Sequence, residues 1–124
     1  MYQSTKLFDG FSCCFRQWKA ETTHCRFLHG YGVSFRVTFE GDLDHRNWVW
    51  DFGGMKRAKT LIDGMQPKEW MDTMFDHTAT GAEKFAEFIY NKLSEFVYEE
   101  TQGRVRIAQV EFMEHGKNTA IYKQ

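Results

Sequence analysis

The sequence predicts an α+β fold, in which a four-stranded antiparallel sheet carries two helices on one face. Three observations predict it: strict alternation over residues 33–40, a helical apolar stripe over 82–99, and a return to strand-like alternation in the last third. Together they give the element order strand, strand, helix, helix, strand, strand. At 124 residues the chain is expected to be one domain spanning 1–124.

The first two strands are expected to form a long hairpin. Residues 33–40 read VSFRVTFE, with apolar and polar side chains in turn, which is typical of a strand with one buried face. Residues 7–18 form a less regular strand before it. The polar run over 19–24 joins the two, so antiparallel pairing is the simplest arrangement.

Two helices follow the hairpin. Asp51 is the expected N-cap of the first, because apolar residues at helical spacing come behind it, namely Met55, Ala58, Leu61 and Ile62. The second helix is expected over 82–99, since six apolar residues form one stripe there: Phe85, Phe88, Ile89, Leu93, Phe96 and Val97. Gly103 lies where a helix stop is expected.

The last third predicts a second hairpin with an irregular first strand. Val105 and Ile107 share one phase, whereas Val110 and Phe112 are out of step with them by one residue. Such a slip indicates a β-bulge at Ala108–Gln109. A tight turn over 116–118 leads into a closing strand at 119–122.

Composition excludes several classes of function. The net charge is −1 with both signs interspersed, which disfavours nucleic-acid binding, and no apolar run is long enough to span a membrane. Three cysteines, an odd number, make a poor disulfide framework and favour a reducing, cytoplasmic location. Aromatic residues make up 17% of the chain, which implies a dense core, an adhesive subunit interface, or both.

One segment carries candidate chemistry: Cys25, with His29, Gly30 and Tyr31 behind it. Taken alone, a cysteine four residues before a histidine is most simply a packed thiol beside a hydrogen-bonded imidazole. Further motifs occur in a fixed order along nearly the whole chain: Phe11 to Phe15, Cys25 to Tyr31, Asp51 to Lys56, Asp76-His77, Glu83 and Glu114. In this order they resemble the 6-pyruvoyltetrahydropterin and 6-carboxytetrahydropterin synthase family.

The resemblance implies a tunnelling-type fold and a lyase that acts on 7,8-dihydroneopterin triphosphate. The expected product is 6-carboxytetrahydropterin, on the route to queuosine and other 7-deazaguanines, and 6-pyruvoyltetrahydropterin is the alternative. Carried over by position, Cys25 is the base, Asp76 and His77 form a proton relay, and Glu114 anchors the pterin. Glu83 is a further substrate-binding candidate. Without the resemblance, Glu114 reads as a solvated residue near a turn.

The resemblance also implies a zinc site, and here the sequence departs from the pattern. The family holds zinc with three histidines, and the corresponding residues are Phe15, His29 and Tyr31. Catalytic zinc usually needs three protein ligands, so His29 alone cannot make the site. A site rebuilt with Cys13 or His24 is the alternative. A second departure is the short connection between His77 and Glu83, which the family has longer.

Three hypotheses about function remain at this point. The first is the lyase, supported by Cys25, Asp76, His77 and Glu114. The second is an altered homologue that binds a pterin or purine-like ligand without zinc chemistry, and the third is a purely structural or interaction module.

The resemblance further implies a homo-oligomer, a trimer or hexamer, in which sheets join edge to edge into a barrel.

Overall fold

The computed structural model describes residues 1–15, 29–63, 81–114 and 116–124. This part of the chain forms the following elements: β1 (Tyr2–Phe15), β2 (His29–Gly41), α1 (Phe52–Asp63), α3 (Ala82–Thr101), β3 (Val105–Glu114) and β4 (Asn118–Lys123). The four strands make one sheet in the order β1-β2-β3-β4, and each neighbouring pair is antiparallel. The predicted fold class is therefore confirmed, and the described elements follow one another in the predicted order.

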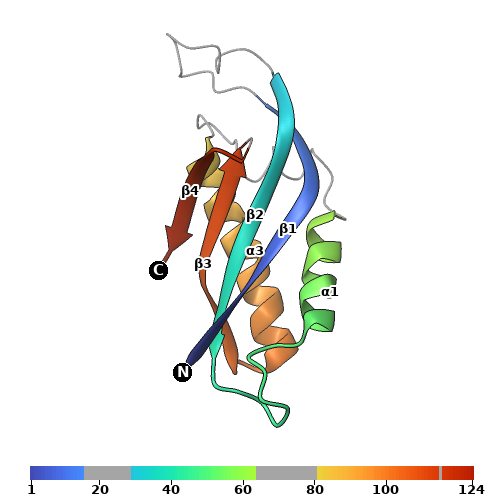
Figure 1. Cartoon of the computed structure of the whole chain (residues 1–124), viewed down its shortest axis with the longest axis vertical. Coiled ribbons are helices and arrows are strands. Elements are labelled where there is room, and N and C mark those ends of the chain that lie inside the picture. The colour runs from blue at the N-terminus through green and yellow to red at the C-terminus, as the bar shows by residue number, and fades with distance from the viewer. Residues whose placement is uncertain (16–28, 64–80, 115) are drawn as a thin grey trace.

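Both helices lie on the same face of the sheet (Figure 1). α3 packs across β3 and β4, and α1 lies beside α3 and β1. Between the layers, stacked rings join the elements: Phe8 with Phe35 at 5.1 Å, and Phe85 of α3 with Phe112 at 5.0 Å between centroids. The helix-covered face is thus an aromatic core, as the composition suggested.

The predicted bulge in the third strand is present. The register passes from Thr38 opposite Gln109 to Phe39 opposite Ile107, so Ala108 is the extra residue. Its consequence is that Ile107 and Val110 are both buried in the core although they differ in phase.

Asp51 begins α1 as expected, because its Oδ1 accepts a hydrogen bond from the backbone N–H of Gly54. α3 ends two residues beyond the expected range. Its stop uses left-handed backbone at Gln102 (φ 53°) and Gly103 (φ 80°), and the Gly103 N–H donates to the Tyr98 carbonyl at 2.9 Å. Among the described residues, neither helix has the length and apolar character needed to cross a bilayer.

Candidate functional site

The structure describes only part of the predicted site. Cys25, Asp76 and His77 lie outside the described residues, so their roles remain predictions. The backbone of His29, Phe15 and Tyr31 is described within β1 and β2. Two further candidates, Glu83 and Glu114, lie on α3 and β3.

Register brings the three expected zinc-ligand positions together. Phe15 is paired with His29, and Cys13 is paired with Tyr31 two residues further along. Because alternate residues of a strand share a face, these four positions belong to one face of the β1–β2 ladder. Residues far apart in the sequence therefore form one compact group of positions.

An irregularity in β1 determines which face that is. Phe8 is opposite Phe35, but the next core-side pair is Phe11 with Val33, so one additional residue is inserted after Phe8. This bulge shifts the phase of the strand, and positions 11, 13 and 15 follow Phe8 on the helix-covered side. With unbroken alternation they would lie on the face that carries no helix.

Glu114 lies at the step where the sheet narrows. The β2–β3 ladder ends at the pair Val33–Glu114, and β1 and β2 continue beyond it as a two-stranded arm (Figure 1). Since Val33 is buried on the helix-covered face, its register partner Glu114 belongs to the same face. Glu114 is partly buried, and its carbonyl accepts the Lys117 N–H at 3.1 Å in the turn to β4.

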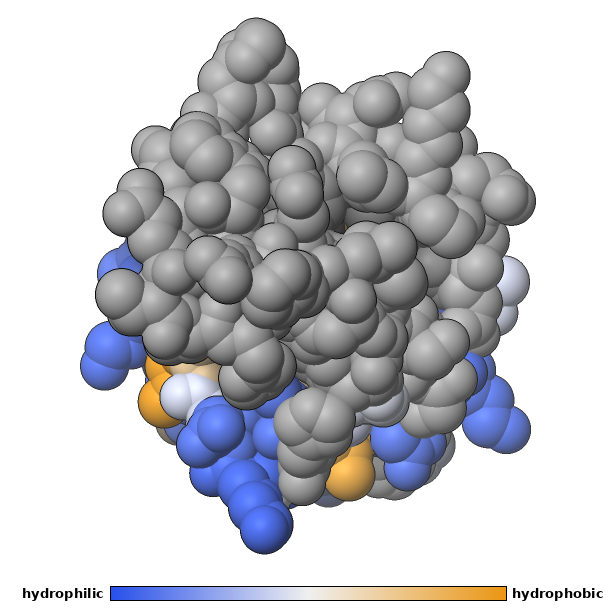
Figure 2. Space-filling model, turned by 90° about the horizontal axis from the view of Figure 1, so that it is seen from above, coloured by the Kyte–Doolittle hydropathy of each residue, from blue (hydrophilic) through white to orange (hydrophobic). Residues whose placement is uncertain are grey.

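Glu83 lies at the same end of the molecule as Glu114. It is exposed in the first turn of α3, two residues before Phe85. Phe85 stacks on Phe112, which is two residues before Glu114, so the ring pair fixes the start of α3 against the end of β3. Two of the predicted substrate-binding residues are thus brought to one end of the fold. Seen from this end, the described residues around the rim are mostly hydrophilic, with small apolar patches (Figure 2).

Two of the three expected zinc-ligand positions carry residues that are not usual zinc ligands. In the described part of the chain, no three histidine, cysteine or acidic residues are grouped so that they could hold a metal. Of the three expected ligand positions, His29 alone carries a usual zinc ligand, because Phe15 has no donor atom and Tyr31 offers a phenol.

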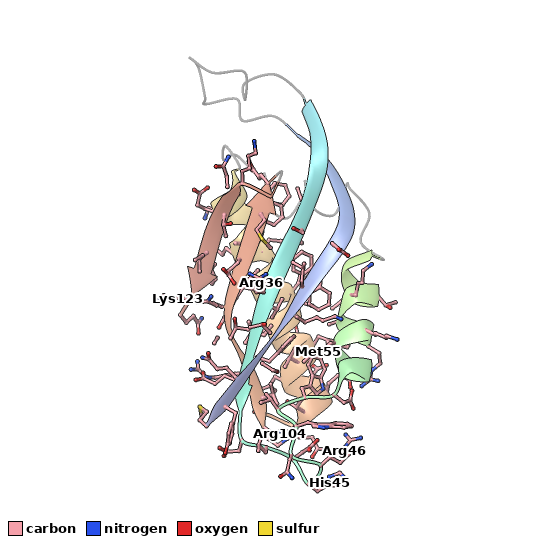
Figure 3. All side chains as sticks on the ribbon, in the orientation of Figure 1. Arg36, His45, Arg46, Met55, Arg104 and Lys123 are labelled. Carbon is pink, nitrogen blue, oxygen red and sulfur yellow. The ribbon has the colours of Figure 1, made fainter. Side chains whose placement is uncertain are left out.

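The opposite end of the molecule carries a charged cluster whose contacts are structural. Arg46 lies at this end of the fold (Figure 3). Its guanidinium lies 4.3 Å from the Trp48 ring centroid and pairs with Asp44 and Asp51 at 3.5 and 3.4 Å. Burial tends to raise the pKa of Asp44, but hydrogen bonds from the backbone N–H groups of Trp48 and Arg46 outweigh it, and the pKa is lowered. These contacts stabilise the 42–51 connection, and the cluster is not part of the candidate site, which lies at the other end of the fold.

Sequence reasoning missed the bulge in β1, although two signals were available. Phe8 and Phe11 are three residues apart, which simple alternation cannot place on one face. Gly10 between them is a residue that often accompanies a bulge.

Comparison with known proteins gives a consistent result. A family model described as 6-pyruvoyl tetrahydropterin synthase matches residues 5–124. The fold is similar to an uncharacterized protein from Wolinella succinogenes (TM-score 0.78, 20% identity, 99% of this chain and 98% of that one). It is also similar to 6-pyruvoyl tetrahydropterin synthase from Caenorhabditis elegans (TM-score 0.77, 19% identity, 99% and 95%). A catalytic-residue mutant of the Plasmodium vivax synthase matches with a TM-score of 0.64 and 17% identity over 100% and 99% of the chains. No curated protein sequence matches the chain.

Proposed function

Because the chain belongs to the 6-pyruvoyl tetrahydropterin synthase family, we propose that it acts on 7,8-dihydroneopterin triphosphate as a 6-carboxytetrahydropterin synthase-like lyase. The observation that carries the proposal is the position of Glu114. Its carboxylate belongs to the same sheet face as the Cys13, Phe15, His29 and Tyr31 positions, at the root of the two-stranded arm. A carboxylate there is a natural acceptor for the paired N–H donors of a 2-amino-4-oxo heterocycle.

The remaining roles follow from the resemblance. Cys25 would remove a proton from the substrate side chain, which requires a thiol whose pKa is lowered by its neighbours. Asp76 would orient His77, and the imidazole would transfer the matching proton. Glu83 would contact substrate from the first turn of α3. None of these steps is assigned to a metal ion.

A second candidate function is binding of a pterin or purine-like ligand without turnover. The observation that favours it is the pairing of Phe15 with His29 and of Cys13 with Tyr31. Two of the positions that would hold the ion are occupied by residues that do not ligate zinc, whereas the anchor Glu114 is retained.

Ligand titration and product analysis separate the two candidates. Purified protein is titrated with dihydroneopterin triphosphate by pterin fluorescence, and products are then resolved by chromatography. Glu114→Gln should weaken binding about 10- to 100-fold, because a hydrogen bond to a charged group contributes about 1.5–3 kcal/mol. Cys25→Ala should bind normally but not turn over.

A matched control for the anchor is Glu111→Gln. Glu111 is on the same strand but on the opposite face, where it pairs with Arg36 at 3.9 Å. This variant should bind like the parent chain. Binding without product would support the second candidate, and equal binding by the Glu114 and Glu111 variants would refute the anchor role.

We also propose a cytoplasmic homo-oligomer, a trimer or hexamer. In the described part of the chain, β1 pairs only with β2 and β4 only with β3, which leaves one edge on each side for another copy. Light scattering on the purified protein gives the mass, and a monomer at micromolar concentration would contradict this proposal.

A further inference from the structure

The β1–β2 arm has the geometry of a three-ligand metal site but not the ligands. Phe15 and His29 are directly paired, and Tyr31 is the next position of β2 on the same face. Direct cross-strand neighbours have Cβ atoms about 4.5–5.5 Å apart, and alternate residues of one strand are about 6.5–7 Å apart. Three imidazoles at these positions could converge on one ion, with metal–nitrogen distances of about 2.0–2.1 Å.

The residues actually present supply one of the three donors. Phe15 has none, and the phenol of Tyr31 is not among the usual zinc ligands. Cys13, the register partner of Tyr31, is the nearest further donor position by register within β1 and β2. Within β1 and β2, Cys13 and His29 together fall one short of the three protein ligands that catalytic zinc typically has, and the other alternative donor, His24, lies outside the described residues.

We infer that the pterin site of this protein operates without a bound metal ion, and that aromatic groups of the arm replace the metal in contacting the ligand. Phe11, Phe15 and Tyr31 all belong to the face that carries Glu114, as a result of the bulge after Phe8. Ring surfaces suit a planar heterocycle better than a hydrated cation. The inference rests on the proposed function for the identity of the ligand, but its metal part can be tested independently.

The decisive experiment restores the missing donors. The full-length double variant Phe15→His/Tyr31→His and the parent chain are each incubated with zinc, dialysed and analysed for bound metal. Cobalt is then substituted, because its visible spectrum reports tetrahedral coordination. The parent chain should retain no stoichiometric metal, and the double variant should retain one ion per chain. Each single variant has only two histidines at these positions, so it should retain clearly less metal per chain than the double variant.

Separate outcomes would overturn each part of the inference. Stoichiometric zinc in the parent chain that is lost on His29→Ala or Cys13→Ala would show a rebuilt metal site. A double variant with native circular dichroism but no gain of metal would refute the arm geometry. If the double variant does not fold, the metal content of the parent chain still tests whether the site is free of metal.

Pterin titration gives the independent readout. Binding by the parent chain should be unchanged by a chelator, and Tyr31→Ala should weaken it several-fold. A loss of binding on chelation would overturn the inference. No pterin binding under any condition, with metal results as expected, would instead refute the proposed function and the ligand part of the inference, while the metal part would stand.

Discussion

Substitution of Gly54 by alanine should destabilise the protein, although alanine is the better helix former. A Cβ atom at this position would lie less than 3.0 Å from three atoms of the Trp50 indole. Trp50 cannot move away easily, because it is only 7% exposed and packs against Phe39 and Phe96 at 5.1 and 6.4 Å between ring centroids. The contact is therefore with a rigid, buried ring system.

The expected magnitude is the difference between two terms. Forcing an additional methyl group into a packed core costs about 1–3 kcal/mol, whereas replacing glycine by alanine in a helix gains up to about 1 kcal/mol. Gly54→Ala should thus lose about 1–2 kcal/mol of unfolding free energy. The matched control is Gly53→Ala, where the nearest atom to the new Cβ is Asp51 Oδ1 at 3.2 Å and the site is exposed. Because that oxygen caps α1, its tight contact with the new methyl group offsets most of the helix-propensity gain of about 0.5–1 kcal/mol, and this variant should stay within about 0.5 kcal/mol of the parent.

Urea unfolding followed by circular dichroism measures both variants. For a chain of this size, 1 kcal/mol corresponds to roughly 3–6 °C in Tm. The midpoint of Gly54→Ala should fall clearly below that of Gly53→Ala, which stays near the parent midpoint, and the m values should be unchanged. Stabilisation of the same size in both variants would refute the close packing of Trp50 over α1.

Three further changes test the contacts around α1. Asp51→Ala should lose about 1 kcal/mol of unfolding free energy, because it removes the cap, whereas Asp51→Asn should retain most of it; urea midpoints compare the two, and equal losses would contradict the capping role. The Arg57–Glu100 pair has a contact of 2.9 Å but is largely exposed, so a double-mutant cycle should give about 0–1 kcal/mol, falling with salt. Because the pKa of Asp44 is lowered in the folded state, its stabilising contribution is complete above its ordinary pKa and is lost as pH falls through the folded value; Asp44→Asn should flatten the acid limb of the stability curve.

The sequence predicted the elements whose signals are local. Alternation in β2, the apolar stripe of α3 and the cap at Asp51 each depend on residues within one or two turns, so the order of elements and the fold class could be predicted. Even the bulge at Ala108 was visible, since a change of phase within one strand needs no knowledge of its partner.

The register between β1 and β2 and the length of β1 could not be predicted in the same way. The pairing of Phe15 with His29 depends on the bulge after Phe8, and the length of β1 depends on which β2 residues it meets. A single inserted residue moves every later position to the other face, so the geometry of the candidate site depends on the bulge after Phe8. This bulge is difficult to predict because apolar and polar residues alternate only weakly in β1. The Cys25, Asp76 and His77 roles stay predictions, because they lie outside the described residues.

The described core and the positions of the expected metal ligands lie in different parts of the sheet. The stacked rings of Phe8, Phe35, Phe85 and Phe112 lie below the Val33–Glu114 step, whereas the positions that would hold a metal lie on the arm beyond it. Because the arm extends past the end of the β2–β3 ladder, we expect substitutions there to cost little unfolding free energy. A TM-score of 0.78 at 20% identity is then the expected result of a retained core, and it places no constraint on the donors of the arm. The variant Phe15→His/Tyr31→His should accordingly gain metal binding, while its unfolding free energy, measured by urea denaturation, stays within about 0.5 kcal/mol of the parent. A larger loss of unfolding free energy would show that Phe15 or Tyr31 belongs to the core instead.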